Sequence, residues 1–509
     1  MKLVNIFLLS HALPTLLVAQ HRYFDPIFPE VKVTADVIYG VNATVLLINP
    51  PPNGAGQAIP QNLKMDVYEP ANDTASARPL IILLHSGNFL PQQVNGGCNG
   101  TKLDGEIVAL AQRLAQRGFV VAAADYRLGW NPVLTDIEIK FTLVNALNRG
   151  VQDSRTCIRF FKKDHAENDQ FRIDPNKITL WGSGTGGWIT LASATLDDMN
   201  DWYLPKFSSP AGPFVYEPVN GNLDGTSVGV VPPNYPPFPV GDTLCYPNHV
   251  GYDSDFALAV NMAGVLLDTS WLQSDDIPVI SFASPSYSGL GYAREACGMG
   301  NFGYDIPPFG MVTIIPDVAG SCAIQARQSM LGNNIAWQNA GFSDPLTLHA
   351  QTINEGHEGF YPFKETYEYT PWAFASSISP YGVPTAMCDT GFMSASAYLD
   401  TVLAYFAPRA CAVLGLNANC NMAVATKEPF LRDNLLIVSP NPAVNEIRVI
   451  AEKPILSAEL YDLHGRIIWK KSGLNAFELR IPRANSPSGV YCLKAQFAEG
   501  LCLKKVIWE

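Results

Sequence analysis

Charged side chains are scarce in this chain, and no segment concentrates basic residues. Charged residues make up 16% of the 509 positions, and the formal net charge is −12. An acidic chain without a basic block repels phosphate backbones, so we expect no nucleic-acid partner. Hydrophobic residues make up 47% of the sequence, a balance typical of folded domains rather than of disordered chains.

Metal-binding patterns are also missing. The ten cysteines form no Cys-x-x-Cys pair and no Cys/His cluster with the spacing of a zinc site. We therefore expect no metal site and no cofactor. Cys411 and Cys420 are close enough in sequence to close a local loop, but two separate buried thiols explain them equally well.

Only the N-terminus has an apolar run that resembles a targeting signal. Lys2 supplies a positive charge, residues 4–18 are mostly apolar, and Ala19 is a small residue at a plausible cleavage point. We interpret residues 1–19 as a signal peptide, with a buried first strand or helix as the alternative. No later run is long enough for a membrane helix, so we expect no transmembrane segment in the mature chain.

Residues 20–422 alternate between strand and helix patterns. Residues 80–87 and 119–129 each begin with a continuous apolar run, as in strands buried on both faces, and helical patterns cover 103–118 and 137–168. This alternation predicts an α/β domain with a mostly parallel central sheet. In such sheets ligands bind beyond the carboxyl ends of the strands, so the turns there are the candidate site.

Two segments depart from this pattern. Residues 202–256 are crowded with Pro, Gly and Asn, and this irregular insertion is either a lid over the site or a surface excursion. Residues 423–433 resemble a linker. The short strand patterns of residues 434–509, separated by regular turn signals, predict a small all-β sandwich.

Five motifs of the larger domain occur in the order and spacing of carboxylesterase-like α/β-hydrolases, over roughly residues 60–365. They are "PLIILLHSGNF", "GFVVAAADYRLG", "QDSRTCIRFFKKD", "FRIDPNKITLWGSGTGG" and "IPVISFAS". The resemblance implies an α/β-hydrolase fold. It also implies a Gly-x-Ser-x-Gly turn between a strand and a helix, with a histidine base, an acid and backbone oxyanion donors.

The sequence departs from that pattern at the nucleophile. Gly182 and Gly186 fill the flanking positions, but Gly184 stands where the family has its serine. Ser183 lies one residue early, so its side chain is expected to leave the turn in another direction. Thr185 lies one residue late, and its use would require a longer strand than the pattern has.

The oxyanion donors are better preserved. "HSGNF" stands where the family has a His-Gly-Gly-Gly type of loop, and by position the donors are the backbone N–H groups of Gly87, Asn88 and Thr185. The alternative is an ordinary turn at the end of a strand. Main-chain donors tolerate side-chain changes, although Asn88 must be able to adopt the required turn.

The base and the acid are less certain. His357, in "EGHEGFYPF", is the best candidate for the base because it lies late in the domain in a Gly-rich turn, and His349 is second. The acid is expected after "PVISFAS", where Tyr287 stands instead. Two of the three triad positions therefore differ from the family pattern.

These departures set the functional expectation. Loss of the nucleophile costs a serine hydrolase roughly a millionfold in rate, while a residual ~10³–10⁴ over water can persist. The leading hypothesis is a catalytically impaired carboxylesterase-like protein with a pocket for a small acyl or ester ligand. One alternative is an active esterase that uses Ser183 or Thr185 with His357, and another is a structural or adhesive surface protein.

The C-terminal 75 or so residues resemble the type A sorting domain of the type IX secretion system of Bacteroidetes. The matching features are "SPNP", "AELYDLHGRII", "SGVYCLK" and the final strand "LKKVIWE". The resemblance implies export by the signal peptide and then recognition of this domain by the secretion translocon. The protein is then expected to be secreted or attached to the outer surface of the cell.

Overall fold

The computed structural model describes residues 21–45, 58–95, 97–132, 136–233, 239–284, 299–306, 310–364, 366, 370–374, 392–417, 420, 436–462, 467–484, 486–497 and 500–509. The predicted signal peptide and the predicted linker lie outside these residues.

An eight-stranded sheet forms the centre of the larger domain, in the order β1-β2-β4-β3-β5-β10-β11-β14. The neighbours from β4 to β14 are parallel, whereas β1 and β2 are antiparallel to their neighbours. The strands are β1 (Val31–Val45), β2 (Ala58–Pro70), β3 (Arg78–Leu84), β4 (Val120–Ala124), β5 (Ile173–Ser183), β10 (Leu258–Met262), β11 (Val279–Ala283) and β14 (Phe360–Pro362). The predicted mostly parallel sheet is confirmed.

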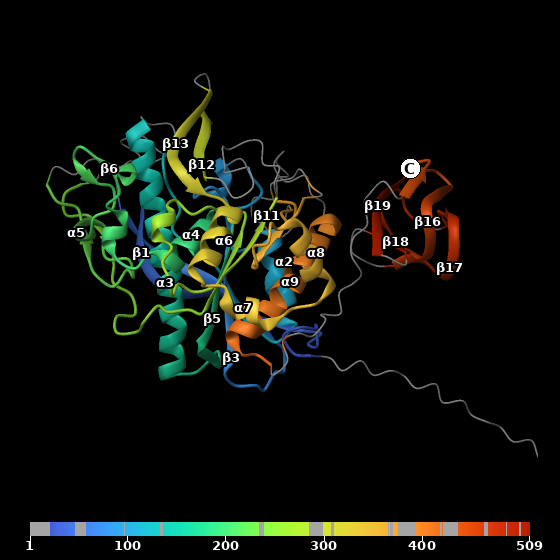
Figure 1. Ribbon diagram of the computed structural model, residues 1–509, viewed down its shortest axis with the longest axis horizontal. Coiled ribbons are helices and arrows are strands. Elements are labelled where there is room, and N and C mark those ends of the chain that lie inside the picture. Colours follow the sequence, from blue (N-terminus) through green and yellow to red (C-terminus); the bar gives the residue numbers. More distant parts are fainter. Residues whose placement is uncertain are drawn as a thin grey trace, which may run out of the picture.

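Helices cover both faces of this sheet (Figure 1). One core joins the sheet to α3 (Asp136–Glu167), α4 (Thr185–Thr195) and α6 (Ser321–Leu331). The other joins it to α2 (Gly105–Ala115), α7 (Ile335–Ala340), α8 (Pro345–Ile353) and α9 (Phe392–Leu414). Because both faces are covered, β3 and β4 are buried along their whole length, which explains their continuous apolar sequences.

Smaller elements complete this domain. They are α1 (Gln92–Asn95), η1 (Met199–Trp202), η2 (Pro205–Phe207), β6 (Ser208–Ser209), β7 (Gly212–Pro213), α5 (Glu217–Asn220), β8 (Gly229–Val230), β9 (Thr243–Cys245) and η3 (Thr269–Trp271). The strands β12 (Met299–Ile306) and β13 (Gly310–Ala319) form an antiparallel hairpin that projects from the domain (Figure 1). This hairpin has no counterpart among the elements predicted from the sequence.

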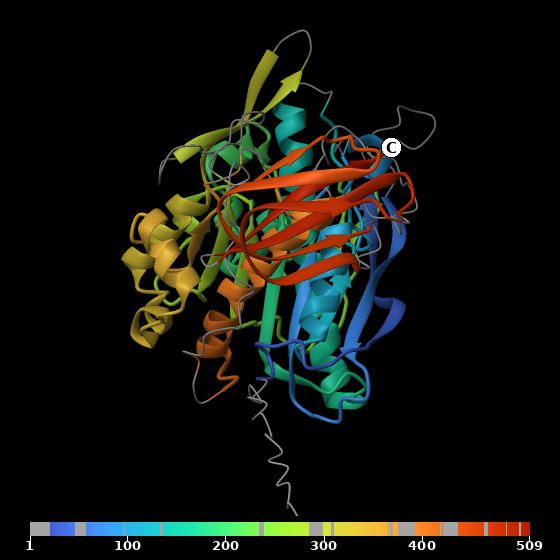
Figure 2. The same ribbon diagram turned by 90° about the vertical axis from the view of Figure 1, so that its right-hand side faces the viewer.

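The C-terminal domain is an antiparallel assembly of five strands, shown in orange and red in Figure 2. They are β15 (Leu436–Ser439), β16 (Glu446–Tyr461), β17 (Ile467–Pro482), β18 (Gly489–Phe497) and β19 (Gly500–Trp508). The last two strands, β18 and β19, form a hairpin in which Phe497 pairs with Gly500.

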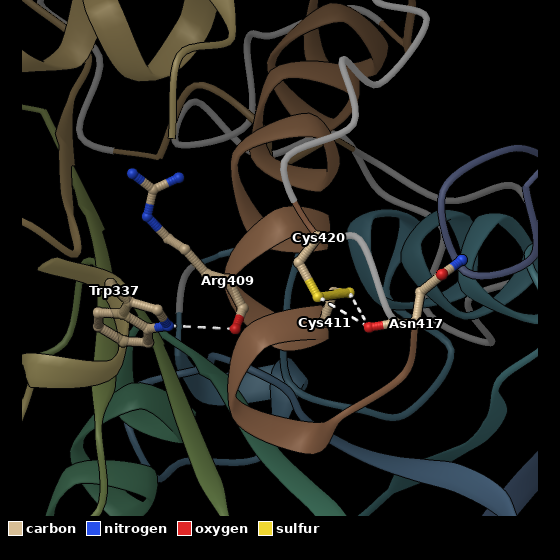
Figure 3. Close-up of a disulfide and its surroundings, with 5 residues drawn as sticks. All are labelled: Trp337, Arg409, Cys411, Asn417 and Cys420. Carbon is tan, nitrogen blue, oxygen red and sulfur yellow. Dashed lines mark hydrogen bonds between the residues drawn. A yellow bond between two sulfur atoms is a disulfide. The ribbon is translucent and has the colours of Figure 1, made fainter. Parts of the chain in front are cut away.

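A disulfide joins Cys411, in the last turn of α9, to Cys420 (Figure 3). Both sulfur atoms lie near the carbonyl oxygen of Asn417, at 3.9 and 3.4 Å. Of the two readings that the sequence left open, the closed local loop is therefore the one observed. Cys98 and Cys322 each take part in a disulfide of their own. Disulfides persist in oxidising compartments, which agrees with export.

Candidate active site

The turn between β5 and α4 has the tight geometry that the sequence predicts. Gly184 has φ 53° and ψ −116° and is the N-cap of α4, and its N–H donates to the carbonyl oxygen of Met262 at 2.8 Å. The flanking glycines are required because a Cβ on Gly182 would lie 2.0 Å from Gly186, and one on Gly186 would lie 2.3 Å from the carbonyl oxygen of Leu84. The backbone of a nucleophile turn is therefore present, with glycine at its apex.

The space beside this apex is filled by a residue that the sequence analysis missed. A Cβ atom on Gly184 would lie 2.2 Å from the Oγ of Ser86 and 3.0 Å from its Cβ. Ser86 follows β3 and belongs to the predicted oxyanion loop. A serine hydroxyl thus stands next to the apex, but another strand supplies it.

The oxyanion loop is held in an unusual conformation. Gly87 has φ 122°, and the non-glycine residues Asn88 and Phe89 have φ 57° and 53°. Each non-glycine residue in the left-handed region costs roughly 1–2 kcal/mol, and such strain concentrates at functional sites. The Trp130 Nε1–H donates to the carbonyl oxygen of Asn88 at 2.6 Å and helps to hold this turn. Asn88 therefore adopts a left-handed backbone conformation although it is not a glycine.

The three expected oxyanion donors remain available. Within the part of the chain that the structure describes, the backbone N–H groups of Gly87, Asn88 and Thr185 donate no hydrogen bond. Thr185 is the first residue of α4, where N–H groups have no intrahelical acceptor and the helix dipole favours negative charge. These N–H groups can therefore donate hydrogen bonds to a ligand oxygen.

The hydroxyl of Thr185 is engaged in a hydrogen bond and is therefore not free beside the apex. Its Oγ1 lies 3.2 Å from the hydroxyl of Tyr126, which also donates to the carbonyl oxygen of His85 at 2.9 Å. The His85 ring stacks on Tyr126 with centroids 4.4 Å apart. Burial lowers the pKa of His85 to about 4, so its ring is neutral at pH 7.

A carboxyl group lies behind this ring. His85 Nε2 is 3.6 Å from Asp125, whose pKa is raised to about 6 because burial disfavours the charged form. The backbone N–H of Lys102 donates to Asp125 at 2.6 Å and partly offsets that effect. The neutral His85 ring donates its Nδ1–H to the carbonyl oxygen of Ser86, so its Nε2 has no hydrogen to donate to Asp125. The Nδ1 bond, and not the contact with Asp125, therefore holds the loop.

Ser183 points to the opposite face of the sheet from Thr185. Its side chain is buried against the α2 and α9 side, and Trp372 Nε1–H donates to its Oγ at 3.4 Å. The neighbouring Glu106, at the start of α2, is fully buried. Burial raises the pKa of Glu106 to about 7, and the Ser183 hydroxyl partly offsets this. Ser183 is thus buried away from the apex, in the direction that the sequence analysis expected.

The structure does not bring His357 to the turn. Strand pairing places Ser183, Met262, Phe282 and Tyr361 at one level across four parallel strands. His357 precedes β14, so it lies at the amino ends of the strands, whereas the turn lies at their carboxyl ends. Its backbone is held there by reciprocal hydrogen bonds with Asn354.

The other triad candidates are also separated from the turn or lie outside the described residues. His349 is on the exposed side of α8. Tyr287 lies outside the described residues, which resume at Met299 after Ser284. From Phe363 to residue 463 the sequence contains no histidine. Among the described residues that follow β14, Trp372 reaches the turn through its bond to Ser183. Trp372 cannot act as a base, because an indole N–H only donates.

The irregular insertion is anchored along the flank of the domain. Asn145 and Gln152 of α3 donate to carbonyl oxygens of the insertion, and Arg155 pairs with Asp224 at 3.0 Å. Asn248 bonds both the N–H and the carbonyl oxygen of Val41 and covers the outer edge of β1. These contacts describe a segment that packs on α3 and β1.

No sequence signal singled out Ser86, Trp372 or Glu106. Ser86 lies inside the recognised "HSGNF" loop, so its position was within reach, but its proximity to Gly184 depends on the register of β3 and β5. Trp372 and Glu106 come from segments far apart in sequence. Only the fold brings them to Ser183.

Two segments of the chain match known families. Residues 65–218 match the BD-FAE family, and residues 438–509 match the secretion system C-terminal sorting domain. No curated protein matches the chain.

Among solved structures, esterase 2 of Thermogutta terrifontis phosphorylated by paraoxon is 18% identical, with 51% of this chain and 72% of that chain covered and a TM-score of 0.29. The apo form of that esterase is 17% identical, with 51% and 73% covered and a TM-score of 0.28.

The sorting domain implies secretion and attachment at the cell surface by the secretion system that reads it. None of the helices that the structure describes is long and apolar enough to cross a membrane. By these matches the chain joins an esterase-like α/β-hydrolase domain, matched over residues 65–218, to a C-terminal type IX secretion sorting domain, matched over residues 438–509.

Proposed function

We propose that the hydrolase domain is catalytically impaired and binds a small acyl or ester ligand at the oxyanion loop. The observation that carries this proposal is the apex itself, where Gly184 lacks a side chain and Ser86 Oγ fills the adjacent space. A nucleophile there would need a base, and the described residue that reaches the turn after β14 is Trp372. The main-chain donors are retained, and they can hold a carbonyl oxygen without cleaving the ester.

The loss of rate that follows removal of the nucleophile supports binding without efficient turnover. Removal of the nucleophile costs roughly a millionfold in rate, so the residual rate enhancement from the oxyanion donors is about 10³–10⁴ over water. The strained turns at Asn88 and Gly184 support the retention of a binding geometry, because strain persists only where the surrounding structure holds it.

The test combines hydrolysis, labelling and binding on the purified chain. We expect no hydrolysis of p-nitrophenyl butyrate above background, no labelling by a fluorophosphonate, and saturable binding of short acyl compounds by NMR titration. A label on Ser183 or Thr185 would establish an active esterase with a displaced nucleophile. If the chain shows no turnover and no binding, a structural or adhesive role at the cell surface is the function that remains.

A further inference from the structure

The hydroxyl of Ser86 lies where the first side-chain carbon of a residue at position 184 would stand. The distance of 2.2 Å between Ser86 Oγ and a Cβ on Gly184 is shorter than any van der Waals contact, so both groups would occupy one volume. Ser86 is also only half-buried, unlike the fully buried His85 before it. Its hydroxyl therefore stands beside the bare apex on a residue that is partly exposed.

The backbone of Ser86 is fixed while its hydroxyl remains available. The neutral His85 ring donates its Nδ1–H to the Ser86 carbonyl oxygen at 2.5 Å, and Tyr126 supports that ring by stacking. Over the described ranges of the chain, the Ser86 hydroxyl makes no hydrogen bond. Since a hydroxyl can rotate to donate or accept, it can bond to a ligand without cost to another contact.

The chemistry of the surrounding groups selects among ligands. Gly87, Asn88 and Thr185 offer three backbone N–H donors beside Ser86, and no described cation or base activates its hydroxyl for attack. A carboxylate presents two oxygens that both accept strong hydrogen bonds, one for the amide donors and one for Ser86. The alkylated oxygen of an ester is a poor acceptor, so an ester uses only the amide donors.

We propose that Ser86 is the specificity-determining residue of this site, donating to one carboxylate oxygen so that short carboxylates bind in preference to their esters. This inference rests on the proposed binding function. A hydrogen bond to a charged group contributes about 1.5–3 kcal/mol, which corresponds to roughly a 10- to 100-fold difference in Kd.

The experiment compares butyrate with methyl butyrate by NMR titration of the full chain. We expect butyrate to bind wild type more tightly than the ester. Ser86→Ala should weaken butyrate binding at least about tenfold while changing ester binding less than about threefold, and Ser86→Thr should restore the preference. Ser472→Ala, on the exposed face of β17, is the matched control and should change neither Kd.

The outcomes separate this inference from the function on which it rests. If both compounds bind but Ser86→Ala leaves the preference unchanged, the role of Ser86 is refuted and the binding function stands. If wild type prefers the ester, the carboxylate assignment is refuted. If neither compound binds, both proposals fail.

Discussion

The contact between Gly184 and Ser86 predicts a measurable energetic coupling. Gly184→Ala adds a single methyl group to a residue with φ 53° and ψ −116°, a conformation that costs a non-glycine residue about 1–3 kcal/mol. The added Cβ would also lie 2.2 Å from Ser86 Oγ and 3.0 Å from Ser86 Cβ. Rotation of the hydroxyl relieves the first contact, but the second requires a shift of the loop, and such overpacking typically costs a further ~1–3 kcal/mol. The total loss of unfolding free energy should be about 2–6 kcal/mol.

Removal of the Ser86 side chain should remove the overlap and leave the backbone strain. In a Ser86→Gly background, Gly184→Ala should therefore cost only about 1–3 kcal/mol. The coupling energy from the double-mutant cycle should then be about 1–3 kcal/mol. Gly332→Ala is the control, because Gly332 has φ 80° but no atom lies within 4 Å of its Cβ position. Its cost should be strain alone and should not depend on Ser86.

Urea unfolding of the four variants, followed by tryptophan fluorescence, measures this cycle. Seven of the nine tryptophans lie between positions 130 and 372, so the signal reports mainly on the hydrolase domain. If the effects of Gly184→Ala and Ser86→Gly add within ~0.5 kcal/mol, the two side-chain positions do not share one space. The account of the blocked apex would then be wrong.

Three further predictions concern the same domain. Gly184→Ser should not raise p-nitrophenyl butyrate hydrolysis above background in either Ser86 background, because the turn has no described base; a clear rise would refute this. Burial raises the pKa of Glu106 from 4.5 to about 7, so its contribution to stability is present below pH 4.5 and is lost as the pH rises through about 7. Glu106→Gln should therefore stabilise the domain relative to wild type by about 3 kcal/mol more at pH 8 than at pH 4, measured by urea unfolding, and an equal effect at both pH values would contradict the buried carboxyl. Replacing Cys411 and Cys420 by serine should cost about 2–3 kcal/mol, because their disulfide closes a loop of 9-residue separation, and an unchanged unfolding midpoint would exclude this contribution.

The fold was predictable because its signals are local. The apolar runs of β3 and β4 and the helical pattern of α3 each depend on residues within one segment, and together they specify a parallel sheet with helices on both faces. The motif around Gly184 also fixed the apex, since the close approaches at Gly182 and Gly186 tolerate no side chain. The absence of a nucleophile there required no tertiary information.

The position of the candidate base, His357, depends on β14, a strand that has no recognisable sequence pattern. β14 has only three residues, too few for a periodic signal, so the sequence could not show that His357 comes before the strand rather than after it. A strand rises ~3.3 Å per residue, so the amino and carboxyl ends of a three-residue strand are close together. The turn at Gly184 lies at the carboxyl ends of the strands. A shift of a few residues in the position of β14 thus decides whether a histidine lies at the amino ends or at the carboxyl ends of the strands.

The sequence by itself determined the domain order, the hydrolase-like sheet and a bare apex at Gly184. Only the tertiary structure decided what surrounds that apex, with Ser86 beside it, Trp372 behind it and His357 at the far edge. The physical reason is that local patterns record which face of an element is buried, whereas contacts between strand ends depend on strand order and register. Those are set by packing across the whole sheet.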